Sequence, residues 1–154
     1  MVNIYTTPSC SSCIKVKKWF KEHHIEFVEH NMFVKKMTKH DIDLIVKNCE
    51  NGFEDIISTK SNYFKQNKID FDNLTYHELV EIIINNPSIL KRPIIVVDDR
   101  VQVGYNADDI REFVPKELRK MIMCENCDVL ENSCAYKELL EKYFEEIKKN
   151  NKKN

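Results

Sequence analysis

The chain has 154 residues, which is the size of one domain with a short appendage. Hydrophobic residues make up 42% and charged residues 32%, the ordinary composition of a protein that folds around a core. Its 24 basic and 25 acidic side chains nearly cancel, which excludes a protein that binds nucleic acid unaided, because that requires a basic excess. Two glycines are too few for a glycine-rich phosphate loop or a dinucleotide-binding fingerprint.

The sequence also indicates a cellular compartment. Its longest apolar runs, such as residues 94–97, are far too short to span a membrane, and residues 1–5 lack the features of a signal peptide. We therefore expect a cytoplasmic protein with no membrane partner. In a reducing compartment structural disulfides are rare, and paired cysteines are more often redox-active or metal-binding. The six cysteines are Cys10, Cys13, Cys49, Cys124, Cys127 and Cys134.

The first thirty residues predict a strand, a turn with two cysteines, a helix and a second strand. Residues 2–5 are rich in β-forming side chains and lead into Thr-Thr-Pro, the pattern of a strand that enters a turn. After the C-x-x-C segment 10–13, apolar residues recur at helical spacing to about His24, and residues 25–29 again favour a strand. This order is the context of a redox motif rather than of a zinc knuckle.

From Thr38 the pattern becomes helical for nearly fifty residues. Thr38 with Asp41, and later Thr75 with Glu78, have the spacing of a capping box at a helix start. Asn-Gly at 51–52 ends the first of these helices, and we expect Ile56 and Ile57 to open the next. Pro87 ends the last.

After this helical region the sequence predicts a hairpin and a short helix. Residues 94–97 form an apolar run bounded by turn residues, and residues 101–105 alternate as the returning strand. A helix capped by Asn106 follows and ends near Pro115. The order βαβ, helical insertion, ββα predicts an α/β protein with a thioredoxin-like fold. We expect one domain at 1–119, with its insertion at about 38–88.

Residues 120–154 differ in character and are expected to form a C-terminal helical extension. A cysteine-containing linker leads into an apolar stripe with i, i+3, i+4, i+7 spacing, typical of an amphipathic helix that packs on a core. The stripe consists of Tyr136, Leu139, Leu140, Tyr143, Phe144 and Ile147.

Cys10 and Cys13 are the strongest candidate for chemistry. Two thiols separated by two residues can close a small disulfide ring, and a helix N-terminus offers free N–H groups and a partial positive charge that favour a thiolate. We interpret Cys10 as the exposed attacking thiol and Cys13 as the resolving thiol within the helix. The alternative is half of a four-thiolate zinc site shared with Cys124 and Cys127.

Arg92-Pro93 is a second candidate element. In a thioredoxin-type layout, a proline before this strand is usually cis and lies against the thiol pair. Arg92 would place a permanent positive charge near a thiolate. The alternative is a surface arginine that happens to precede a strand.

Four ordered motifs within residues 1–119 resemble the Spx transcriptional regulators of low-GC Gram-positive bacteria, which belong to a wider group related to arsenate reductases. The resemblance implies binding to the C-terminal domain of the RNA polymerase α subunit, control of transcription during thiol stress, and a switch disulfide between Cys10 and Cys13. DNA would then be contacted only within the polymerase complex. The motifs are Tyr5-Thr6-x-Pro8-Ser9-Cys10-x-Ser12-Cys13, Ile56-Ile57-Ser58-Thr59, Arg92-Pro93-Ile94-Ile95-Val96 and Gln102-Val103-Gly104-Tyr105-Asn106.

The resemblance also implies roles for single residues. Gly52 matches the glycine at the α-subunit contact, where a missing side chain permits close approach, and Lys60 is expected in the same contact. Arg92, with Pro93, matches the arginine associated with the oxidised form. Two positions depart from the family pattern: Ile14 stands where a basic residue is usual, and Lys60 where arginine is frequent.

Two other classes of function remain open at this point. One is an arsenate reductase or glutaredoxin-like thiol oxidoreductase, although the positions of Ile14, Lys60 and Asn106 lack the arginines that an oxyanion site would use. The other is a zinc-dependent interaction module built on Cys124, Cys127 and Cys134, which would need a fourth ligand. Our preferred interpretation is a monomeric, non-enzymatic regulator that needs no cofactor or metal. A protease adaptor is a further candidate partner.

Overall fold

The computed structural model describes residues 1–67, 69–115, 119, 142 and 145, and the chain divides into two compact units, Met1–Ile110 and Arg111–Asn154. In the second unit, the backbone N–H of Arg119 donates to the carbonyl of Pro115 and its Nε to the carbonyl of Val114, both at 2.9 Å. The predicted extension at 120–154, with Cys124, Cys127 and Cys134, lies almost wholly outside the described residues. Its helical form and the boundary at residue 119 stay predictions.

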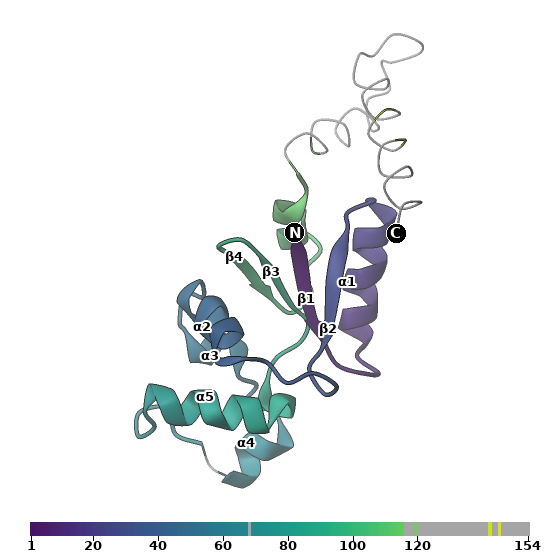
Figure 1. The fold of residues 1–154 in the computed structure, drawn as a ribbon. Helices are drawn as coiled ribbons and strands as arrows, with labels where there is room; N and C mark the ends of the chain where they lie inside the picture. The colour runs from purple at the N-terminus through teal and green to yellow at the C-terminus, as the bar shows by residue number, and fades with distance from the viewer. Residues whose placement is uncertain (68, 116–118, 120–141, 143–144, 146–154) are drawn as a thin grey trace. The chain divides into compact units, whose positions relative to one another are not determined.

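Within the described residues, four strands form one sheet in the order β2-β1-β3-β4 (Figure 1). The strands are β1 (Val2–Thr6), β2 (Phe27–Asn31), β3 (Ile94–Val97) and β4 (Arg100–Val103). β1 pairs parallel with β2 and antiparallel with β3, and β3 and β4 form an antiparallel hairpin. This confirms the predicted thioredoxin-like layout. β2 begins two residues later than the predicted strand 25–29.

The helix α1 (Ser11–Glu22) begins within the C-x-x-C segment, with Cys10 as its N-cap, and lies alongside β1 and β2 (Figure 1). Its buried residues, Cys13, Val16 and Phe20, recur every three or four positions and so share one face. The helix therefore turns the second cysteine inward while the first stays at its N-terminus.

The residues between β2 and β3 form a group of short helices at the carboxyl end of β1 and β2 (Figure 1). We call residues 38–90 the helical insert. It contains α2 (Lys39–Lys47), α3 (Phe53–Ile56), α4 (Asn62–Asn67), α5 (Tyr76–Asn85) and a 3-10 helix, Pro87–Ile89. The capping boxes predicted at the starts of α2 and α5 are both present, with Thr38 and Thr75 as their N-caps.

One helix of the insert was predicted wrongly. Ile56 and Ile57 do not open a helix: α3 ends at Ile56, and Ile57 forms a β-bridge with Leu90. The bridge joins two segments that are distant in the sequence. Two backbone hydrogen bonds hold it: Ser58 N–H donates to the carbonyl of Ile89, and Lys91 N–H donates to the carbonyl of Ile56. These contacts tie the middle of the insert to the segment that leads into Arg92.

After β4, the predicted helix near Asn106 is a short 3-10 helix, Asp109–Phe113. The Asn106 side chain accepts the backbone N–H of Asp108 at 2.9 Å, in the turn that precedes this helix. No helix within the described residues is long and apolar enough to cross a membrane.

Candidate redox site

The thiol pair lies at the start of α1. Cys10 is the N-cap residue in extended conformation, and its Sγ accepts the backbone N–H of Cys13 at 3.4 Å. The Cys10 carbonyl accepts the N–H of Ile14 at 3.1 Å, the first hydrogen bond of the helix. Cys10 therefore takes the place that Ser or Asp usually occupies as a cap, and its sulfur receives a backbone donor that stabilises negative charge.

The two thiols have different environments. Cys10 is partly exposed, whereas Cys13 is only 2% exposed. Burial is the main cause that raises the pKa of Cys13 well above that of a free thiol, and a hydrogen bond with the Cys10 side chain raises it further; a backbone hydrogen bond from Thr7 and the charge of Arg92 act in the opposite direction. Cys13 is accordingly protonated at neutral pH, and Cys10 is the sulfur that an oxidant can reach.

A pocket of about 200 Å³ opens beside both thiols. One of its walls carries an ion pair: Lys17 Nζ lies 2.8 Å from Glu29 Oε1, and the buried Thr6 hydroxyl donates to the same oxygen at 2.7 Å. Ile14, also in the lining, is 61% exposed. The pocket is lined by Thr6, Thr7, Pro8, Ser9, Cys10, Cys13, Ile14, Lys17, Glu29 and Asn31. No arginine is among these, and Lys17 is paired with Glu29.

The Arg92-Pro93 peptide bond is cis, as predicted. Pro93 is buried and Arg92 exposed. The Arg92 guanidinium donates to the carbonyl of Ser88 at 3.4 Å, and its charge lowers the pKa of Cys13. Arg92 therefore acts electrostatically on the buried thiol of the pair.

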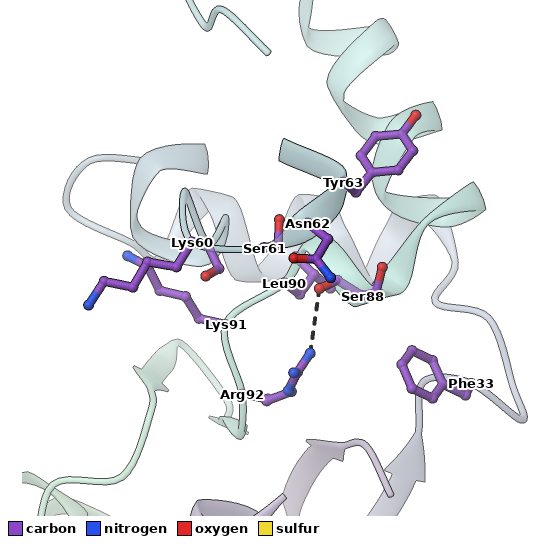
Figure 2. Close-up of a pocket in the computed structure, with 10 residues that line it drawn as sticks. Phe33, Lys60, Ser61, Asn62, Tyr63, Ser88, Leu90, Lys91 and Arg92 are labelled. Atoms are coloured by element: carbon purple, nitrogen blue, oxygen red, sulfur yellow. Dashed lines mark hydrogen bonds between the residues drawn. The ribbon is translucent and has the colours of Figure 1, made fainter. Parts of the chain in front are cut away.

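Arg92 also belongs to a larger pocket, of about 620 Å³, at the edge of the insert (Figure 2). Lys60 and Lys91 lie at one side of this pocket and Phe33 at the other (Figure 2). Sequence reasoning assigned Lys60 and Arg92 to different roles, and the structure brings them to one pocket. The lining consists of Phe33, Ser58, Lys60, Ser61, Asn62, Tyr63, Ser88, Leu90, Lys91 and Arg92.

Gly52 lies apart from both pockets, at the N-cap of α3. Its φ of +60° with ψ of −123° is a conformation that side-chain-bearing residues rarely adopt. A Cβ here would find Val46 at 3.7 Å, which is ordinary contact. The glycine is therefore required by the backbone, while the space around it is open.

Cys49, the third described thiol, lies in the insert just after α2 and is partly buried. Burial raises its pKa to about 11, Asp55 acts in the same direction, and Lys91 opposes them. A thiol in this state is a weak nucleophile, so Cys49 is an internal reference for the thiol pair rather than part of the site.

Comparison with known proteins shows the family of the chain. Residues 5–113 match the model of the ArsC family. This chain belongs to the ArsC family. Within it, the global transcriptional regulator Spx 1 of Lactococcus lactis is 43% identical over 128 residues, 83% of this chain and 100% of the relative. The global transcriptional regulator Spx of Staphylococcus aureus is 44% identical over 119 residues, 77% of this chain and 91% of the relative. These relatives confirm the Spx resemblance.

Several solved structures are similar to this chain. Their sequence identities are low, so they support the fold alone. An arsenate reductase from Vibrio cholerae has a TM-score of 0.67 at 17% identity and covers 73% of this chain and 97% of its own. A putative ArsC family related protein from Bacteroides fragilis has a TM-score of 0.64 at 22% identity, with 72% and 95% covered. Both support the same fold for this chain.

Proposed function

We propose that this chain is a redox-responsive transcriptional regulator that binds the C-terminal domain of the RNA polymerase α subunit and is switched by a Cys10–Cys13 disulfide. The observation that carries the proposal is the asymmetric thiol pair at the start of α1, with Cys10 accessible and Cys13 buried beside it. It is supported by the Spx relatives, which are named as global transcriptional regulators.

The chemistry of the switch follows from that asymmetry. With a peroxide as oxidant, the Cys10 thiolate attacks one peroxide oxygen, the O–O bond breaks, and Cys10 becomes a sulfenic acid while hydroxide leaves. The Cys13 sulfur then displaces water from the sulfenic acid, so that both sulfurs are oxidised to one disulfide and the peroxide is reduced to water. Because Cys13 is held in the first turn of the same helix, this second step needs no second chain.

The proposal assigns the polymerase contact to the helical insert, at Gly52 and Lys60. Gly52 offers a surface with no side chain, and Lys60 is exposed at the edge of the larger pocket. The redox pocket is made by other residues, from β1, β2, α1 and the turn between β1 and α1. In this proposal the chain binds its partner with one part and senses oxidants with another.

A pull-down with purified polymerase α C-terminal domain tests the proposal. The full chain is incubated with the domain under reducing conditions and after mild peroxide, and the retained fraction is measured. We expect retention that changes with oxidation in the wild type and does not change in Cys13→Ser. Absence of binding under both conditions, or turnover of arsenate with a thiol reductant, would favour the enzymatic alternative.

Replacement of Arg92 by alanine is expected to leave disulfide formation intact but weaken the effect of the disulfide on transcription. Cys10 and Cys13 remain in place, so the disulfide still forms, but the charge that acts on Cys13 and the bond to Ser88 are lost. We expect the oxidation-dependent change in transcription from a responsive promoter to fall several-fold. Lys91→Ala is the matched control, because Lys91 lines the same pocket but acts on Cys49 instead. Normal activation by Arg92→Ala after oxidation would show that Arg92 has no part in the switch.

A further inference from the structure

One polar bond joins the helical insert to the strand that precedes the thiol pair. The hydroxyl of Tyr5, in β1, donates to Asp41 Oδ1, in the first turn of α2, at 3.0 Å. The two residues are 36 positions apart, and Tyr5 is 7% exposed. A hydrogen bond to a carboxylate in such a setting is stronger than one between neutral groups.

Asp41 serves two elements at once. Its second oxygen, Oδ2, accepts the backbone N–H of Thr38 at 2.8 Å and the Thr38 hydroxyl at 2.7 Å, which completes the capping box of α2. Burial by itself raises the pKa of Asp41, but the hydrogen bonds from Thr38 and Tyr5 outweigh it, so the pKa is lowered and the group is ionised at neutral pH. The start of α2 therefore cannot shift against β1 without loss of the Tyr5 bond, the cap, or both.

Tyr5 itself is firmly held. Its ring stacks on His30 of β2, with centroids 4.9 Å apart and planes 24° apart, and its backbone faces Ile94 of β3. The next residue along β1, Thr6, lines the redox pocket. Tyr5 is thus fixed in the strand that leads to Cys10, with its hydroxyl reaching out to the insert.

We propose that Tyr5 is a positioning residue that couples the thiol pair to the helical insert: through Asp41, it passes a change in the strand before Cys10 to the start of α2. This inference rests on the proposed function and deepens it, since the insert carries Gly52 and Lys60. In this proposal, formation of the Cys10–Cys13 disulfide alters the turn that follows β1, and the Tyr5–Asp41 bond passes that change to α2.

The chain contains a matched control. Tyr76 of α5 donates a hydrogen bond to Asp43, two residues after Asp41 on the same helix. Tyr5→Phe and Tyr76→Phe each remove one hydroxyl that binds an aspartate of α2. Only the first cuts the link to the sheet, because Tyr76 and Asp43 both belong to the insert.

Hydrogen exchange, followed by mass spectrometry on reduced and peroxide-treated protein, gives a readout that needs no polymerase. In the wild type and in Tyr76→Phe, we expect oxidation to change the exchange of amides in α2. In Tyr5→Phe, we expect that oxidation-dependent difference to fall towards zero while the disulfide forms at the wild-type rate. A Tyr5→Phe protein that keeps the full difference in α2, or a wild type that shows none, would overturn the proposal.

Two further measurements keep this result separate from the proposed function. If the wild type binds no polymerase α domain, the proposed function fails, while the exchange data still decide the coupling. If it binds, the ratio of oxidised to reduced affinity should fall towards one in Tyr5→Phe and stay at the wild-type value in Tyr76→Phe. Should Tyr5→Phe fold poorly by circular dichroism, Asp41→Asn weakens the same bond from the other side and must give the same loss of difference.

Discussion

Mild peroxide is expected to join Cys10 to Cys13 within one chain, and Cys10→Ser is expected to abolish every oxidation-dependent change in partner binding. The reason is the asymmetry of the pair: the Cys10 sulfur is accessible and receives a backbone donor, whereas Cys13 is 2% exposed. Peptide mapping without reduction measures the crosslink, and alkylation before oxidation should modify Cys10 ahead of Cys13.

Cys49→Ser is the control for this experiment. Cys49 lies in the insert, and burial raises its pKa to about 11, so its removal should leave both the crosslink and the binding unchanged. Detection only of bonds from Cys10 to Cys124, Cys127 or Cys134 would contradict the assignment of the switch to residues 10 and 13.

Gly52→Arg is expected to abolish binding to the polymerase α domain, and Gly52→Ala to retain most of it. Both variants force a side-chain-bearing residue to a φ of +60°, a strain of about 1–3 kcal/mol, and so both should lower the free energy of unfolding by a similar amount. Only arginine adds a long charged side chain to a surface that, in the proposal, lies close against a partner. Urea denaturation measures the first effect and a binding titration the second.

The pair of variants separates two roles of the glycine. Space for a Cβ exists, with Val46 at 3.7 Å, so alanine meets strain but no clash. If both variants lose binding equally, backbone strain at residue 52 causes the loss, and the contact lies elsewhere on the insert. If Gly52→Arg binds as well as the wild type, Gly52 lies outside the interface.

Local patterns in the sequence predicted most of the fold. β1, α1 and the two capping boxes depend on residues within a few positions of one another, and these were correct. α4 was not predicted as a separate helix, because its six residues are too few to show a helical period. Tyr63 and Phe64 pack against the core, but no residue of α4 is fully buried. Ile57 was misassigned because its backbone bridge to Leu90 is a contact between distant segments, which periodicity cannot reveal.

The same holds for the candidate site: features formed by neighbouring residues could be predicted, and features formed by distant residues could not. The thiol pair at a helix start was visible in the spacing of Cys10 and Cys13, since both lie on one turn. The shared pocket of Lys60 and Arg92 and the Tyr5–Asp41 bond were not visible, because each joins residues more than thirty positions apart. Asp41 was found as a capping residue, and the sequence holds no signal that its other oxygen serves β1.

The sheet order also bears on how the protein is made. β1 pairs with β2 across a short stretch of chain, Val2 with Phe27, but with β3 only after the whole insert has been synthesised, Asn3 with Val96. Pairing between distant segments is the slower step in folding, and the N-terminal part of a chain leaves the ribosome first. On a growing chain, Cys10 and Cys13 therefore emerge long before Arg92. In a newly made molecule both thiols are thus present before the part of the sheet that leads from Arg92 is in place.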